Sequence, residues 1–186
     1  MSNDQKISLI PFGVRHGIIL GLIAVTFILL IYIISYDIMV NWWFSLLTIV
    51  LITSIVVYFG IQFRYSIGGY IGYGTAFRLS LLMLIIYSMI QVAFGLLLYN
   101  VIDPELPELL SKASIDNMEA MYRSFGMSQQ DIDNQIEILE VEIPKQFQPL
   151  NQIKNSWIIL ISSLIFSAIA ALFIRRNKPL IDNVNK

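Results

Sequence analysis

The chain has 186 residues, of which 56% are hydrophobic and only 13% are charged. Because a soluble domain usually carries about a quarter charged residues, this composition indicates that much of the chain is buried in a membrane. The sequence contains no cysteine and a single histidine, His16, which excludes a disulfide, a thiol nucleophile and a histidine-based metal cluster within this chain.

Four runs without any charged residue divide the sequence, at 17–36, 38–63, 79–102 and 155–174. Each run reaches the roughly 20 apolar residues that a helix needs to cross the hydrocarbon core. Backbone polar groups in lipid have to be paired within the segment, which favours helix over strand. We therefore predict an all-α membrane protein with transmembrane helices at 13–36, 42–62, 78–102 and 155–174.

The first of these helices is expected to remain in the mature protein. Its uncharged run is longer than the roughly 7–15-residue apolar core of a signal peptide, and no small-residue cleavage pattern follows it. Residues 37–41, which begin with Asp37, are expected to form a tight loop into the second helix.

The basic residues predict how the chain is oriented. The positive-inside rule places 1–12, 63–77 and 175–186 in the cytoplasm, and 37–41 and 103–154 on the outer side. All three tryptophans lie at the predicted outer boundary, where indole rings favour the headgroup level; they are Trp42, Trp43 and Trp157. The basic residues that carry this prediction are Lys6, Arg15, Arg64, Arg78, Arg175, Arg176, Lys178 and Lys186.

A stretch rich in glycine and tyrosine connects the second and third helices. It contains the Gly-Tyr-Gly of potassium filters, but a filter needs a re-entrant loop in a tetrameric pore, and no pore helix precedes this stretch. It also lacks the Lys-Ser/Thr of a phosphate-binding loop. We interpret it as a tight cytoplasmic turn, with Tyr70 and Tyr73 at the interface and Arg78 anchoring the third helix.

The segment 103–154 is predicted to form two helices outside the membrane. Apolar residues in its first half recur at three- and four-residue steps, as in an amphipathic helix, and Gly126 supplies a stop. Ser128, with an acidic residue three positions later, resembles the capping box that opens a helix. Pro144 is expected to end this second helix. We predict a helical hairpin on the outer leaflet, joined to the fourth membrane helix through Pro149.

The second of these helices carries a candidate partner surface. At 100° per residue, Asp133, Glu137 and Glu140 share one face. Ile138 and Val141 point away from the main apolar stripe. A solvated face is the ordinary interpretation of such charges, and the alternatives are a docking surface for a basic partner or a weak divalent-cation site.

Small residues spaced by four on the first and last membrane helices predict helix–helix contacts, because they allow backbones to approach closely. Internal packing is favoured over homodimerisation. The side-chain amide of Gln91, deep in the third helix, is expected to form an interhelical hydrogen bond. No ionisable residue lies at the centre of a span, which argues against a pump or secondary transporter. The small residues are Gly13, Gly17 and Gly21 on the first helix, and Ser163, Ser167 and Ala171 on the last.

Five short motifs occur in a specific order: Gly68-Gly69-Tyr70-Ile71, Tyr73-Gly74-Thr75-Ala76-Phe77-Arg78, Tyr99-Asn100-Val101-Ile102-Asp103-Pro104, Gly126-Met127-Ser128 and Arg175-Arg176-Asn177-Lys178-Pro179. In this order and spacing the chain resembles the domain of unknown function 4199 family over nearly its whole length. The resemblance implies a four-helix protein of the inner membrane of Gram-negative bacteria, with its outer segment in the periplasm. It implies no activity and supplies no catalytic, cofactor-binding or metal-binding residue.

The favoured hypothesis is a non-enzymatic accessory or assembly subunit of a cell-envelope complex, which acts through the periplasmic hairpin. Membrane lipid and either an envelope protein or a second copy of the chain are its expected partners, whereas neither a cofactor nor nucleic acid is expected.

Two other functions are considered. One is a small oligomeric transporter or channel, for which Gln91, Thr53 and Ser54 are the candidate polar lining. The other is a membrane enzyme that acts on lipid-linked substrates with outer carboxylates. This last hypothesis ranks lowest because no nucleophile–base set is visible; its candidate carboxylates are Asp103, Glu105 and Glu108.

Overall fold

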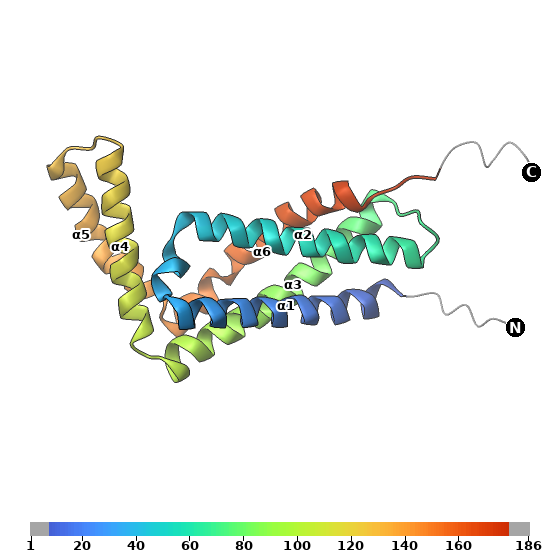
Figure 1. Cartoon of the computed structure of the whole chain (residues 1–186), viewed down its shortest axis with the longest axis horizontal. Helices are drawn as coiled ribbons and strands as arrows, with labels where there is room; N and C mark the ends of the chain where they lie inside the picture. Colours follow the sequence, from blue (N-terminus) through green and yellow to red (C-terminus); the bar gives the residue numbers. More distant parts are fainter. Residues whose placement is uncertain (1–7, 179–186) are drawn as a thin grey trace, which may run out of the picture. The chain divides into compact units, whose positions relative to one another are not determined.

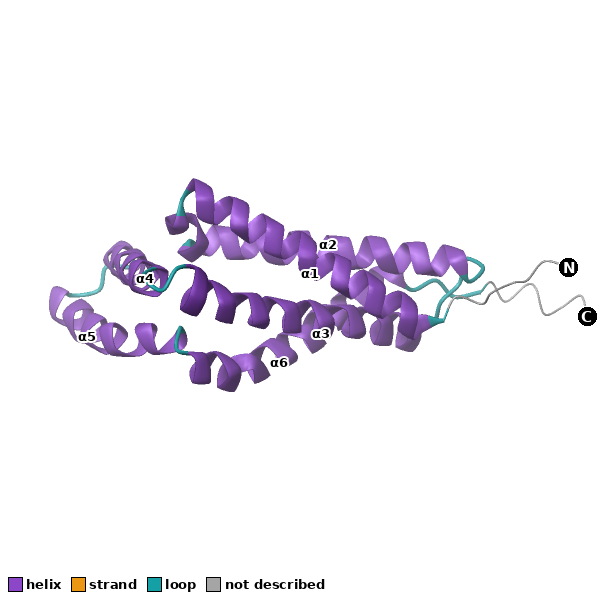
Figure 2. Cartoon of the chain, turned by 90° about the horizontal axis from the view of Figure 1, so that it is seen from below, coloured by secondary structure: helices purple, strands orange, loops and turns teal. Residues whose placement is uncertain are grey.

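A computed structural model of the chain describes residues 8–178 (Figure 1). Helices account for most of these residues, and no strand occurs among them (Figure 2). Lys6, Pro179 and Lys186, which entered the sequence-based predictions, lie outside the described residues. The elements are α1 (Leu9–Ile34), the 3-10 helix η1 (Tyr36–Val40), α2 (Trp42–Ser66), α3 (Tyr73–Leu97), the π-helix η2 (Leu98–Ile102), α4 (Leu106–Ser124), α5 (Gln129–Gln146) and α6 (Pro149–Ile174).

Four helical segments are long and apolar enough to cross a membrane. α1, α2 and α6 have 26, 25 and 26 residues, and α3 with η2 forms a segment of 30 residues. Large apolar side chains are exposed along these segments, including Ile33 (76%) and Phe173 (65%). Lipid tails are as apolar as leucine, so such exposure is expected inside a bilayer. The predicted all-α class is confirmed, and the four segments indicate a multi-pass membrane protein.

Several helices begin earlier than the sequence predicted. α1 begins at Leu9 rather than 13, α3 at Tyr73 rather than 78, and α6 at Pro149 rather than 155. Charged and polar residues had marked the expected ends, but a helix continues past the hydrocarbon boundary wherever its polar side chains reach water. Pro149 suits the first position of α6 because the N–H it lacks would have no partner there.

Two connections are more helical than the sequence predicted. Most of residues 37–41, predicted as a tight loop, lie in η1. Pro144 was expected to end α5 but lies inside it, since α5 continues to Gln146. A proline this close to a helix end removes only one hydrogen bond of the last turn. That turn is closed instead by the N–H of Phe147, which donates to the carbonyl of Pro144 (3.3 Å).

The chain divides into two compact units, and each of the four long helical segments contributes to both. Within the described residues, the first unit comprises 8–22, 50–89 and 159–178, and the second comprises 23–49 and 90–158. The first unit therefore holds the starts of α1 and α3 and the ends of α2 and α6. The second unit holds the other ends of these helices, together with η1, η2, α4 and α5.

In the first unit, α1 approaches α3 closely at glycine positions. Gly13, Gly17 and Gly21 are all buried. A Cβ added to Gly17 would lie 2.9 Å from the Cβ of Ile86 and 3.0 Å from the carbonyl oxygen of Met83. One of these neighbours is backbone, so a larger residue at position 17 would have to displace α3 itself.

The small residues of α6 are buried in the same unit. Ser163, Ser167 and Ala171 are 5%, 0% and 0% exposed. The hydroxyl oxygen of Ser163 lies 3.4 Å from that of Ser88 on α3, and both hydroxyls donate to carbonyls of their own helices. Small side chains thus let α3 and α6 meet without leaving either hydroxyl unpaired.

The connection between α2 and α3 is tied to the end of α6. Arg64 donates from Nη1 to the carbonyl oxygen of Ile174 (2.9 Å), which caps the last turn of α6. Ile71 and Arg176 exchange two backbone hydrogen bonds of 3.0 Å. The guanidinium of Arg176 lies 5.8 Å from the centre of the Tyr70 ring. These contacts make the glycine- and tyrosine-rich stretch a closed turn.

We expect Gly17→Val to lower the free energy of unfolding of the detergent-solubilised protein by about 1–3 kcal/mol, the usual cost of overpacking a filled site. Thermal unfolding followed by circular dichroism measures the change. Gly74→Val is the matched control, because no heavy atom lies within 4 Å of the Cβ position there. Equal losses in the two variants would contradict a special role for the close α1–α3 contact.

Candidate functional site

α4 and α5 pack against each other and are called here the α4–α5 pair (Figure 1). Gly126 lies between them with a φ of 75°, a left-handed conformation that favours glycine. The hydroxyl oxygen of Ser128 accepts the N–H of Asp131 (3.2 Å) and so opens α5. Ile132 and Ile143 of α5 are 2% and 6% exposed. The chain thus turns sharply and presents the apolar face of α5 to α4.

Asp103 connects the start of α4 to a membrane helix. Its Oδ1 accepts the backbone N–H groups of Glu105 (3.2 Å) and Leu106 (3.1 Å), two donors that the helix itself leaves without a partner. Its Oδ2 accepts a hydrogen bond from the hydroxyl of Tyr32 on α1 (2.8 Å). One carboxylate therefore caps α4 and holds it to α1.

A small apolar core surrounds this link. Leu98, Leu106 and Leu110 are 1%, 0% and 2% exposed. Aromatic and aliphatic side chains from α1, η1, α3 and η2 pack against these leucines, together with Phe147 directly after α5. Among them, the Phe147 ring meets Tyr99 edge-on at a centroid distance of 5.3 Å. The α4–α5 pair is therefore anchored both where α4 begins and where α5 ends.

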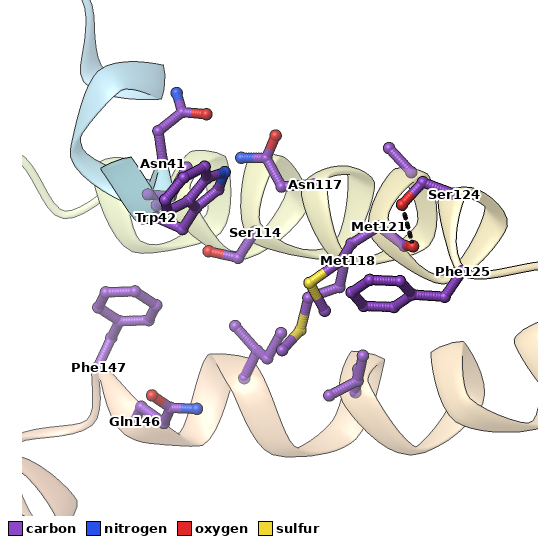
Figure 3. A pocket seen from close by; sticks show the side chains of 14 residues that line it. Asn41, Trp42, Ser114, Asn117, Met118, Met121, Ser124, Phe125, Gln146 and Phe147 are labelled. Carbon is purple, nitrogen blue, oxygen red and sulfur yellow. Dashed lines mark hydrogen bonds between the residues drawn. The ribbon is translucent and has the colours of Figure 1, made fainter. Parts of the chain in front are cut away.

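A groove of about 830 Å³ lies between the two helices of the pair and the η1–α2 connection (Figure 3). We call it the α4–α5 groove. None of the fourteen described residues that line it is charged. Its apolar lining is Val40, Trp42, Met118, Ala120, Met121, Phe125, Leu139, Ile143 and Phe147, and its polar lining is Asn41, Ser114, Asn117, Ser124 and Gln146.

A second hollow, of about 240 Å³, holds the acidic residues singled out in the sequence. Asp133, Glu137 and Glu140 line it around Ile136, together with Glu119 of α4. Glu119 forms an ion pair with Arg123 (2.6 Å). Among the described residues, no group of three or more potential metal ligands is close enough to hold an ion, so the geometry does not support the divalent-cation alternative.

The two aliphatic residues of the predicted partner surface are exposed. Ile138 is 55% and Val141 is 56% exposed. We call the four carboxylates with Ile138 and Val141 the acidic surface. Glu119 was missing from the predicted set, because only the packing of α4 on α5 brings it beside α5, and helical periodicity within one helix carries no such signal.

Most of the polar residues considered for a transporter or a membrane enzyme either form hydrogen bonds within the protein or are exposed. The Ser54 hydroxyl donates to the carbonyl of Val50 and is exposed. Both carboxylate oxygens of Asp103 already accept hydrogen bonds, and Glu105 and Glu108 are exposed. The amide nitrogen of Gln91 is buried without a hydrogen-bond partner among the described residues, so the expected interhelical bond of this nitrogen is not formed.

A family model matches most of the chain. The family is described as "Protein of unknown function (DUF4199)", and the match covers residues 15–176. It includes α1 from Arg15 onward, the other three membrane-crossing segments and the whole α4–α5 pair, and it confirms the resemblance drawn from the motifs. No curated protein and no solved structure matches the chain.

We expect Asp103→Ala to loosen the start of α4 by about 1–3 kcal/mol, because it removes both a helix cap and a charged hydrogen-bond acceptor. Hydrogen–deuterium exchange of the full-length protein should then become faster in the first turns of α4. Tyr32→Phe removes only the hydrogen bond to α1, so that turn should stay protected. Equally fast exchange in both variants would contradict the capping role.

Proposed function

This chain belongs to the DUF4199 family of proteins of unknown function, and we propose that it is a non-enzymatic accessory or assembly subunit of a bacterial cell-envelope complex. In this proposal the protein lies in the inner membrane of a Gram-negative bacterium with its ends in the cytoplasm. The α4–α5 pair is then a periplasmic hairpin that binds a partner protein.

The distribution of arginine and tryptophan supports this orientation. Four crossings return the chain to the side from which it entered. The arginines that flank the membrane helices belong to the first unit, and the tryptophans belong to the second. Arginine favours the cytoplasmic side and tryptophan the headgroup level. The arginines are Arg15, Arg64, Arg78, Arg175 and Arg176, and the tryptophans are Trp42, Trp43 and Trp157.

The acidic surface carries the proposal. Four carboxylates from two helices gather in one hollow, and only Glu119 has an arginine beside it among the described residues. Ile138 and Val141, each more than half exposed, lie on the same helix as three of these carboxylates. In water such aliphatic exposure contributes nothing favourable, whereas burial by a partner contributes about 25 cal/mol per Å².

The chemistry of this surface defines the partner. Carboxylates attract and orient a basic surface, and like charges repel wrong partners. The exposed aliphatic side chains then supply contact area that is removed from water when the partner binds. We therefore assign as partner an envelope protein with a segment that presents lysine or arginine beside apolar residues.

The test uses the full-length protein with a photo-crosslinking amino acid at Ile138, irradiated in native membranes and purified in mild detergent. We expect a defined crosslinked partner with a basic segment. The double variant Glu137→Lys/Glu140→Lys should lower recovery of the crosslinked partner by about tenfold or more, because it reverses the charges that attract a basic segment. A tenfold loss of affinity corresponds to about 1.4 kcal/mol of binding free energy. Raising the ionic strength before irradiation should also lower recovery, because salt screens exposed charges.

Glu108→Lys/Asp116→Lys is the matched control. It makes the same change in charge at two exposed positions of α4 outside the acidic surface. Recovery that survives reversal at Glu137 and Glu140, or that falls equally in the control, would refute the acidic surface as the binding site.

A further inference from the structure

The α4–α5 groove is uncharged although the helices that form it are not. α4 carries five charged residues and α5 carries six, yet none of them lines the groove. All charges of the pair are thus kept out of a hollow that is large enough for a ligand. A hollow of about 830 Å³ lies within the range of about 300–1,000 Å³ that is usual for ligand sites.

Part of the polar lining is already hydrogen-bonded within the protein. The hydroxyls of Ser114 and Ser124 donate to the carbonyls of Leu110 and Met121 in their own helix, both at 2.7 Å. The side-chain amide of Asn41 donates to the carbonyl of Asp37 (2.9 Å). These groups therefore offer few free donors to a ligand, and most of the groove presents hydrocarbon and sulfur.

Two methionines and a phenylalanine form the α4 wall of the groove (Figure 3). Met121 is 40% and Phe125 is 74% exposed, so this wall is only partly covered by the protein itself. Methionine is unbranched and flexible and adapts to ligands of irregular shape. Such a wall suits a long, flexible apolar ligand.

One end of the groove is formed by the connection between two membrane helices. Val40 is the last residue of η1, and Trp42 is the first residue of α2, a membrane-crossing helix. Trp42 is 74% exposed, and tryptophan is enriched at the headgroup level. The groove therefore opens beside the end of a membrane helix.

We propose that the α4–α5 groove binds an acyl chain of a membrane phospholipid. The uncharged lining excludes recognition of an ionic metabolite, and it offers nothing to the basic partner of the acidic surface. The bilayer beside α2 supplies acyl chains at high local concentration. The amides of Asn117 and Gln146, which hydrogen-bond to no other described side chain, are available to the glycerol esters.

The experiment uses full-length protein in vesicles of dioleoyl phosphatidylethanolamine and dioleoyl phosphatidylglycerol, with a trace of phospholipid that carries a diazirine in its acyl chain. After irradiation, adducts are mapped by digestion and mass spectrometry. We expect labelling of Met118, Met121 and Leu139. Ala120→Trp places a large side chain at the groove from an exposed position and should lower this labelling by about tenfold, or about 1.4 kcal/mol of affinity.

Two further variants make the result decisive. Ile138→Trp adds the same side chain on the acidic surface, outside the groove, and should leave the labelling at its original level. Met121→Asp, made in a separate protein, introduces a charge into the groove wall and should lower labelling by itself. It therefore tests the groove even if the indole in the Ala120→Trp variant turns away from it.

Several outcomes would overturn the proposal. One is labelling that persists in both groove variants; another is labelling that is equally strong on the outer face of α5, which would show general contact with the bilayer. Dissociation of a dimer by Ala120→Trp without loss of lipid adducts would assign the groove to a second copy of the chain. Each of these results is independent of whether a basic partner binds the acidic surface.

Discussion

The pairing of backbone polar groups in lipid is the constraint on which the rest of this structure depends. An unpaired N–H or C=O in hydrocarbon costs several kcal/mol, so the uncharged runs form long helices that pair these groups internally. The buried hydroxyls of Ser88 and Ser163 follow the same rule, since both donate to carbonyls of their own helices, whereas that of Ser80 has no hydrogen-bond partner among the described residues. Packing between these helices combines glycine, alanine and serine with buried large apolar side chains such as Leu20, Leu79 and Met83. The varied polar chemistry of the chain is therefore concentrated in the α4–α5 pair and in the connections.

Asp103 joins the α4–α5 pair to the membrane helices. Its carboxylate satisfies the first N–H groups of α4 and also binds the hydroxyl of Tyr32 in a membrane helix. The leucine core around it buries Leu98 and Leu106 on either side of this residue. A ligand that tilted α4 would have to break these hydrogen bonds or move α1 with it. The link thus gives the start of α4 a defined position against α1. A ligand-induced tilt of α4 would be transmitted to α1 through these hydrogen bonds.

The α4–α5 pair separates its charged and uncharged surfaces. The acidic surface gathers carboxylates around Ile136, whereas the α4–α5 groove has no charged lining among the described residues. On α5 these two hollows are lined by different residues: Leu139, Ile143 and Gln146 line the groove, and Asp133, Ile136, Glu137 and Glu140 line the acidic hollow. The basic protein segment and the acyl chain that we propose as ligands would therefore not compete for the same atoms. An accessory subunit built in this way could hold a lipid and a protein partner together.

The sequence by itself determined the features that depend on local pattern. Four uncharged runs required four helices, glycine at position 126 required a turn, and Ser128 with Asp131 predicted the start of α5. The motifs were also sufficient to indicate the family. Tertiary structure decided everything that depends on which faces meet. The hydrogen bond between Tyr32 and Asp103 joins residues 71 positions apart, and Glu119 joins the acidic surface only because α4 packs on α5. The uncharged groove is likewise a property of two helices and a connection, so periodicity along one helix could not reveal it. Helix ends needed the structure as well, since α1, α3 and α6 begin before the positions that charged and polar residues mark in the sequence.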